Sequence, residues 1–353
     1  MSNTNLWKYV DQDVANDIAY FWERVIEGFD YRAGISESFN GDDPAIQWNT
    51  EYFGPNVTMD DRLRYIATNI STNKEMSEEN RVLNFLITHF YGGRDCHRVL
   101  NAELDPRKAY TDFERVLIDT EYLFDIKSNL DRAKALGYSI WSKTELHTSL
   151  MGASNKFARE KYGYDTHAVN MIAWLSDWLV DGTVDKILNC QTLKECVEVL
   201  LSKEGIGPYY GYHGATDQST NPNLPFNHDE AFVVPGPGCQ LTLKMLFPNL
   251  TNRECSPGNQ VVWVRENQEK LFGKINFNKY WHNIIVEDKE VYNFDQNELM
   301  CYTAEVALCQ YGVYCDMKKN TNRIAKRQIA ETDVTSIVKS LQHKPSSIEE
   351  FLI

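Results

Sequence analysis

The stretch that decides the fold is TLKECVEVLLSKEGIGPYYGYHGATDQ, residues 192–218. Thr192 followed three residues later by Glu195 is a capping box, so it predicts the start of a helix that runs to Lys203-Glu204. Gly205-Ile206-Gly207 predicts a tight turn, and Pro208 suits the first position of a second helix. A helix, a G-hydrophobe-G turn and a second helix make a helix-hairpin-helix element. Backbone N–H groups in such a turn can hold a DNA phosphate, whereas an ordinary helix corner with a glycine cap is the alternative.

The rest of the chain favours helices as well. Apolar residues recur at helical spacing in segments such as Phe21 to Phe29, Trp174 to Leu179 and Leu193 to Leu201, and strict alternation is rare. The prediction is an all-α protein with two intertwined helical subdomains. Its regions are expected to be an N-terminal helical region (1–125), the hairpin region (126–250) and a C-terminal helical region (251–353).

Composition excludes several classes of protein. The 353 residues are 42% hydrophobic, which is enough for a folded core, and the net charge is −14. Any contact with DNA must therefore come from a local cationic patch. Five cations crowd into residues 318–327, and this cluster is the predicted contact for the phosphate backbone, with a solvated helix face as the alternative. It consists of Lys318, Lys319, Arg323, Lys326 and Arg327.

Cysteine spacing argues against a metal centre. Cys301, Cys309 and Cys315 are spaced C-x7-C-x5-C, which lacks the short step and the fourth ligand of an iron–sulfur cluster, and no zinc spacing occurs. Neither a metal nor a cofactor is expected. The polar N-terminus and the absence of any long apolar run predict no signal peptide and no membrane span.

A long loop follows the hairpin, and it carries the candidate acid–base residues. Asp229 follows Gly205 by 24 residues and lies between His228 and Glu230. In order and spacing this resembles the helix-hairpin-helix DNA glycosylase superfamily, in which a catalytic aspartate follows the hairpin. Asp229 matches that aspartate. Glu230 is the adjacent competitor, and His213 and His228 flank the loop in positions that suit acid–base work.

Two further segments narrow the resemblance. Residues 233–238 read VVPGPG, and Glu305, Leu308, Cys309 and Tyr314 match a later E-x-x-L-C-E-x-x-K-Y pattern, from which Gln310 and Val313 depart. Together with FGPNV at residues 53–57, these segments resemble the alpha-glutamyl/putrescinyl thymine pyrophosphorylases of bacteriophages. These are glycosylase-fold enzymes, also described as amino acid:DNA transferases.

The resemblance implies a DNA-modifying transferase and a set of partners. Its DNA substrate would be duplex phage DNA carrying 5-pyrophosphoryloxymethyluracil, made by an upstream 5-hydroxymethyluracil DNA kinase. An amino acid or amine would replace the pyrophosphate, in the cytoplasm of the infected bacterial host, and the hypermodified thymine would evade restriction. The alternatives are a DNA glycosylase that releases a modified base and a noncatalytic helix-hairpin-helix DNA-binding protein.

Site residues follow from this chemistry. Asp229, Glu230 and His228 are the candidate catalytic residues. Gly236 and Gly238 precede a predicted helix, so their N–H groups suit the oxygens of the pyrophosphate, with a plain proline-glycine helix entry as the alternative. The predicted DNA contacts are Lys203, Gly205, Gly207 and Tyr209, together with Lys318, Lys319, Arg323 and Arg327 of the cationic cluster. Tyr209 is also a candidate for packing the extruded base.

Overall fold

The computed structural model confirms the all-α prediction: the regular elements of the described residues are helices, apart from two short antiparallel strands, Ile285–Val286 (β1) and Lys289–Glu290 (β2). The structure describes residues 5–32, 36–39, 43, 46, 65–91, 96–138, 157–227, 230–275, 285–286, 289–290, 299–319 and 334–342. None of the described helices is both long and apolar enough to cross a membrane.

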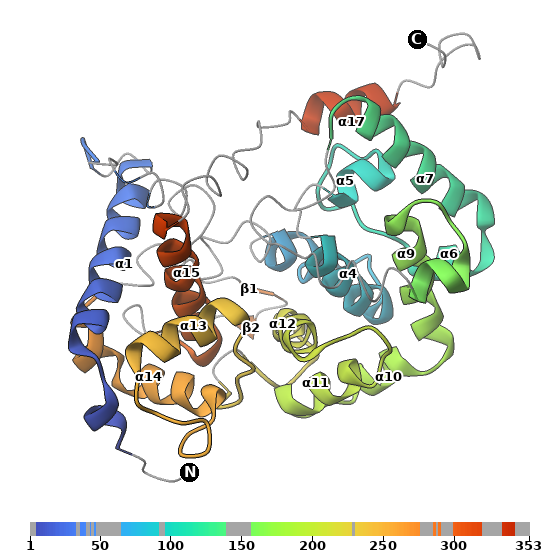
Figure 1. Ribbon diagram of the computed structural model, residues 1–353. Coiled ribbons are helices and arrows are strands. Elements are labelled where there is room, and N and C mark those ends of the chain that lie inside the picture. The colour runs from blue at the N-terminus through green and yellow to red at the C-terminus, as the bar shows by residue number, and fades with distance from the viewer. Residues whose placement is uncertain are drawn as a thin grey trace.

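The helices gather in two lobes (Figure 1). One lobe, here the hairpin lobe, contains α4 (Glu78–Tyr91), α5 (Cys96–Asn101), α6 (Phe113–Ile118), α7 (Thr120–Ala135), α9 (His167–Val180), α10 (Thr183–Leu188), α11 (Leu193–Leu201), α12 (Pro208–Gln218) and α17 (Val334–Gln342). The other, here the α15 lobe, contains α1 (Gln12–Arg32), α13 (Pro237–Leu246), α14 (Pro257–Phe272) and α15 (Cys301–Lys319). Two single-turn elements are also described, a 3₁₀ helix at Leu6–Tyr9 and a π-helix at Ile66–Ile70.

In the α15 lobe, α1 packs against α13, α14 and α15. Ile18, Phe21, Trp22 and Val25 recur at the spacing of one helix face and are buried. The Phe21 ring lies 4.6 Å from that of Tyr314, and the Tyr311 hydroxyl donates to Asp17 at 2.6 Å. The N-terminal helix is therefore held by the C-terminal part of the chain. Helices of the predicted first region lie in both lobes, and the division at 125 and 250 stays a prediction.

Helices α4 and α12 of the hairpin lobe lie side by side near the middle of the molecule (Figure 1). Nearly all of α12 is buried, although it is rich in polar residues. Polar contacts hold α12 and the residues just after it: Gln218 Nε2 donates to the Val82 carbonyl of α4 at 2.9 Å, and the Thr220 hydroxyl lies 3.0 Å from that of Ser71, which follows the π-helix. Because buried polar groups need partners, these contacts fix how α12 sits in the lobe.

Candidate functional site

The hairpin forms at the predicted place. The Thr192 hydroxyl accepts from the Glu195 N–H at 3.2 Å, and the Glu195 carboxylate accepts from the Thr192 N–H at 3.3 Å, so the capping box is confirmed. The helix ends at Leu201, two residues before the predicted end. Gly205 has a φ of 88°, which favours glycine, and Pro208 takes the first position of α12.

The space beside the backbone of Gly207 is free of other protein atoms. A Cβ at this residue would meet no atom within 4 Å. An N–H in such a turn can approach a phosphate closely, so the geometry is compatible with the predicted DNA contact, which stays a prediction.

Lys203, by contrast, is held within the protein. Its ammonium pairs with Asp181 at 2.6 Å, donates to Thr183 at 3.0 Å and lies 5.0 Å from the ring centre of Trp178. A DNA phosphate would have to compete with these partners. The assignment of Lys203 to DNA stays a prediction.

The loop after α12 is anchored by apolar and polar contacts. Phe226 and Val233 are buried. Glu230 accepts from the Leu193 N–H at the start of α11 at 2.9 Å, an arrangement that stabilises a helix N-terminus. Burial raises the pKa of Glu230 above its usual range, while the bond from Leu193 opposes that rise. His228 and Asp229 lie outside the described residues, so their predicted roles stay predictions.

Gly236 lies where the two lobes meet, and its N–H already donates a hydrogen bond within the protein. It donates to Oε1 of Glu305 on α15 at 2.8 Å. A Cβ on Gly236 would lie 2.6 Å from Cε2 of Tyr209, so the Tyr209 ring covers this backbone. The expected anion position at the start of α13 therefore holds an internal carboxylate in this structure. A pyrophosphate that used the Gly236 N–H would have to displace Glu305.

Gly238 lies at the crossing of α13 and α15. A Cβ on Gly238 would lie 2.7 Å from the Cys309 sulfur, and a Cβ on Gly312 would overlap the Gly238 carbonyl oxygen. Glycine at both positions lets the two backbones approach. This packing accounts for Gly238 by itself, and the pyrophosphate contact of Gly236 and Gly238 stays a prediction.

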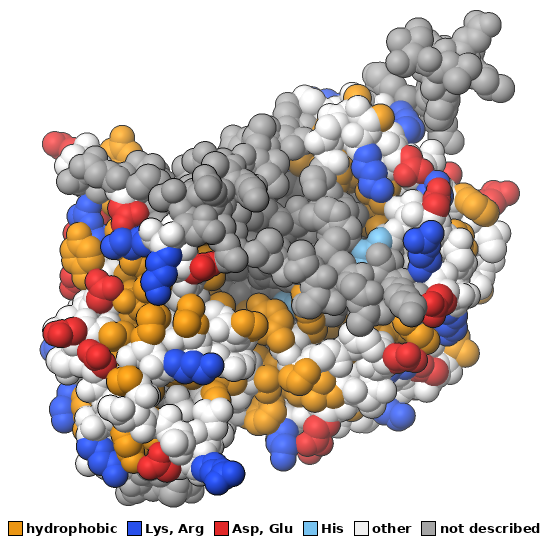
Figure 2. All heavy atoms as spheres, viewed as in Figure 1, with side chains coloured by type: hydrophobic (Ala, Val, Ile, Leu, Met, Phe, Trp, Pro, Cys, Tyr) orange, Lys and Arg blue, Asp and Glu red, His pale blue; other side chains and the backbone are white. Residues whose placement is uncertain are grey.

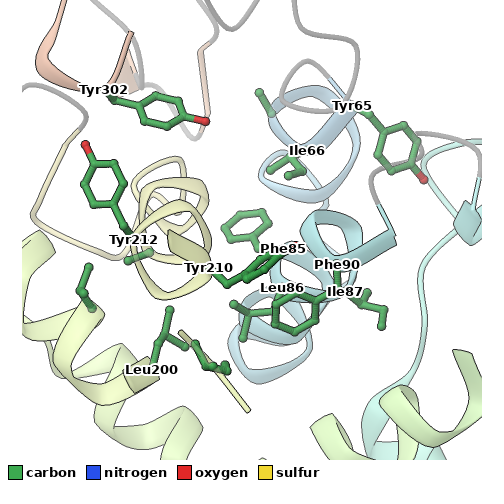
Figure 3. Close-up of a cluster of buried hydrophobic side chains, with 14 of the residues drawn as sticks. Tyr65, Ile66, Phe85, Leu86, Ile87, Phe90, Leu200, Tyr210, Tyr212 and Tyr302 are labelled. Carbon is green, nitrogen blue, oxygen red and sulfur yellow. The ribbon is translucent and has the colours of Figure 1, made fainter. Parts of the chain in front are cut away.

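A buried acid–base cluster fills the junction between the lobes. His213 of α12 places Nε2 at 3.6 Å from Oε2 of Glu305 and Nδ1 at 3.5 Å from the Tyr302 hydroxyl. The Tyr209 ring lies 4.1 Å from the His213 ring. Figure 3 shows Tyr212 of α12 and Tyr302 of α15 on facing sides of this junction, and their ring centres lie 6.2 Å apart.

A second histidine–carboxylate pair lies behind the first. His89 of α4 and Asp217 of α12 are joined through Nδ1 and Oδ2 at 2.9 Å, and both side chains are buried. The His89 and His213 rings stack with their centres 5.9 Å apart. Two buried histidine–carboxylate pairs in contact are typical of proton-handling sites, although structural ion pairs have the same chemistry.

Sequence reasoning missed most of this cluster. It identified His213 and Tyr209, but gave no acid–base role to Glu305, Tyr302 or the His89–Asp217 pair. One signal was present: Glu305 is the single charge in the apolar run CYTAEVALC of residues 301–309, and a carboxylate there is expected to be buried and paired.

The predicted cationic cluster is only partly described. Lys318 and Lys319 are exposed at the end of α15, and the Lys318 ammonium lies 3.0 Å from the Tyr314 hydroxyl. Arg323, Lys326 and Arg327 lie outside the described residues. Figure 2 shows Lys and Arg side chains interspersed with Asp and Glu over the coloured part of this face. The backbone-contact role of the cluster stays a prediction.

Comparison with known proteins identifies the family. No curated protein and no solved structure matches the chain. A family profile described as "5-hmdU DNA kinase, helical domain" matches residues 50–322, which is well over half of the 353 residues and includes the hairpin, the loop and all of α15. The chain therefore belongs to the 5-hmdU DNA kinase helical domain family.

Proposed function

We propose that the chain is a DNA-modifying transferase that replaces the pyrophosphate of 5-pyrophosphoryloxymethyluracil in duplex DNA with an amino acid or amine. The observation that carries the proposal is the family match, because 5-hmdU is 5-hydroxymethyldeoxyuridine, the nucleoside that a kinase must phosphorylate to give this substrate. The setting is phage DNA in the cytoplasm of an infected bacterium, where the modified thymine evades restriction.

The geometry supports a reaction on a base in DNA. An open hairpin backbone at Gly207 suits a phosphate contact, and aromatic residues lie next to it at the lobe junction. An enzyme that acts on a base in a duplex must extrude that base, and aromatic contacts help to offset the few kcal/mol of lost stacking. Tyr209 is the residue proposed to pack the extruded base.

The reaction needs a base and an anion site. A neutral amine nitrogen donates its lone pair to the methylene carbon on C5, the C–O bond breaks, and the pyrophosphate leaves with the bonding electrons. Asp229 is the proposed base that deprotonates the incoming ammonium to this neutral amine, with Glu230 and His228 beside it. The start of α13 at Gly236 and Gly238 is the proposed pyrophosphate position. Glu305 keeps the Gly236 N–H, so the pyrophosphate would interact with the positive end of α13 and not with that N–H.

The description of the family also favours a second candidate. A helical domain named for a kinase suits recognition of 5-hydroxymethyluracil in DNA on behalf of a phosphoryl-transfer partner. In that case the chain would bind hydroxymethylated DNA more tightly than pyrophosphorylated DNA and would transfer no amine by itself.

Product analysis separates these candidates. Purified chain is incubated with a pool of amines and with DNA that carries 5-pyrophosphoryloxymethyluracil. The DNA is then digested to nucleosides, and their masses are measured by mass spectrometry. The transferase predicts a nucleoside with the mass of an amine adduct, whereas abasic sites indicate a glycosylase. Unchanged nucleosides, together with tighter binding to hydroxymethylated DNA, indicate the recognition domain.

An Asp229→Asn variant is the control for the catalytic assignment. Loss of a general base slows a reaction by roughly 10²–10⁴-fold, and DNA binding should remain near wild type. Turnover above about a tenth of the wild-type rate would move the role to Glu230 or to a histidine.

A further inference from the structure

The buried cluster at the lobe junction has the order of a catalytic triad: a hydroxyl, an imidazole and a carboxylate in a row. We propose that Tyr302, His213 and Glu305 form a proton relay that removes the proton released during amine transfer. This inference rests on the proposed function and deepens it, because it assigns proton handling to residues outside the Asp229 loop.

The contacts define the direction of the relay. Glu305 faces Nε2 of His213 at 3.6 Å, and the Tyr302 hydroxyl faces Nδ1 at 3.5 Å. A carboxylate beside Nε2 favours a proton on that nitrogen, which leaves Nδ1 as the acceptor for the tyrosine hydroxyl. Both distances are long for hydrogen bonds, as is common for catalytic contacts before substrate binds.

The second carboxylate oxygen of Glu305 is held by a hydrogen bond from the backbone. Its Oε1 accepts the Gly236 N–H at 2.8 Å, at the positive end of the ten-residue helix α13. The side chain is buried, and a buried carboxylate is stable as an anion only with such partners. The start of α13 thus holds the negative charge that stabilises an imidazolium at His213.

The groups around His213 come from three helices. Glu305 and Tyr302 face it from α15, and the His89 ring stacks on it from α4, with Asp217 behind His89. From α12 itself, Tyr209 and Tyr212 contact the ring at centre distances of 4.1 and 5.6 Å. Burial and the Glu305 charge hold the pKa of Tyr212 well above its usual range, so this hydroxyl stays neutral.

The proton balance is simple. When the amine nitrogen has formed its bond to the methylene carbon and the bond to pyrophosphate has broken, the nitrogen is a positively charged ammonium that must lose one proton. It passes that proton to the Tyr302 oxygen as the Tyr302 proton moves to Nδ1 of His213. The resulting imidazolium is stabilised by Glu305, and the same path through Tyr302 returns the proton once the product has left. Glu305 is a positioning residue, because it acts through His213.

The first test is the pH dependence of transfer by the full chain. Glu305→Gln keeps the shape of the side chain and removes its charge, so the pKa of His213 should fall. The acidic limb of the kcat profile should then move to lower pH by about one unit or more. Tyr302→Phe keeps the aromatic ring and should lower kcat by roughly 10²–10⁴-fold, with KM for DNA unchanged. The control is Glu254→Gln, at a carboxylate bound to Tyr9 near the N-terminus, which should leave rate and profile as in wild type.

An unmoved acidic limb in Glu305→Gln, or a wild-type rate in Tyr302→Phe, would overturn the relay. Imidazole NMR keeps the inference separable from the proposed function. In ¹⁵N-histidine-labelled protein, the His213 resonance, identified with His213→Gln, should titrate at lower pH in Glu305→Gln than in wild type. Equal titration would overturn the pairing. An absence of transfer by the wild type, with the NMR difference intact, would instead overturn the proposed function.

Discussion

His97 provides a quantitative test of the hairpin lobe. It is fully buried on α5, its Nε2 lies 2.6 Å from the Thr88 hydroxyl, and its ring stacks on Tyr65 at 6.1 Å. Burial lowers the pKa of His97 from 6.5 to about 3. The protein should therefore lose stability in acid for a reason that can be traced to one side chain.

The sign follows from where the proton binds. Because the folded pKa lies below the unfolded value, the unfolded chain takes up the proton first as the pH falls, and folding stability decreases from about pH 6.5 down to about pH 3. Each pH unit within this window costs about 1.4 kcal/mol. At pH 5 the loss from His97 is thus about 2 kcal/mol, and above pH 6.5 it vanishes.

The assay is urea unfolding of wild type and His97→Gln at pH 7.5 and pH 5. Glutamine keeps a polar group near Thr88 but does not titrate. The variant should be less stable than wild type at pH 7.5, and its further loss at pH 5 should be smaller than that of wild type by about 2 kcal/mol. Equal losses in the two proteins would refute a buried, neutral His97.

Three further predictions concern packing and DNA contacts. Gly312→Ala should destabilise the protein by about 1–3 kcal/mol in thermal unfolding, because the added Cβ overlaps the Gly238 carbonyl; a neutral effect would contradict the close α13–α15 crossing. Gly207→Val should leave stability within about 1 kcal/mol of wild type and weaken binding to modified and plain DNA alike, since its Cβ enters open space beside the hairpin backbone. An unchanged DNA affinity of this variant would show that the hairpin is an ordinary helix corner that does not contact DNA. Replacing four cations with glutamine should reduce the slope of the logarithm of the DNA-binding constant against the logarithm of the salt concentration by roughly two to four units. The choice of thymine derivative should not change. A wild-type slope would show that DNA binds elsewhere on the protein. The four cations are Lys318, Lys319, Arg323 and Arg327.

Local signals explain why much of the fold was predictable. The capping box at Thr192, the proline at the start of α12 and the G-P-G entry to α13 each act within a few residues, and each produced the expected helix start. The end of α11 was placed two residues too late, because helix ends depend on weak local preferences.

The site depended on contacts that sequence spacing does not show. Gly236 was expected to offer a free N–H, but Glu305, which lies 69 residues away, accepts it. Lys203 was expected to face DNA, but Asp181 binds its ammonium. His89 and Asp217 lie 128 residues apart, so only the packing of α4 against α12 reveals them as a pair. Whether a charged residue in a helix is buried or exposed depends on its interaction partner, which the sequence alone does not identify.

The most direct test of the central claim is the stoichiometry of the reaction. Wild-type chain is mixed with DNA that carries 5-pyrophosphoryloxymethyluracil and with a ¹⁵N-labelled amine, and released pyrophosphate and labelled nucleoside are counted in the same sample. The account predicts one pyrophosphate for each labelled nucleoside, with the sugar–base bond intact. Pyrophosphate release without label in the nucleoside, or label-free abasic sites, would contradict it.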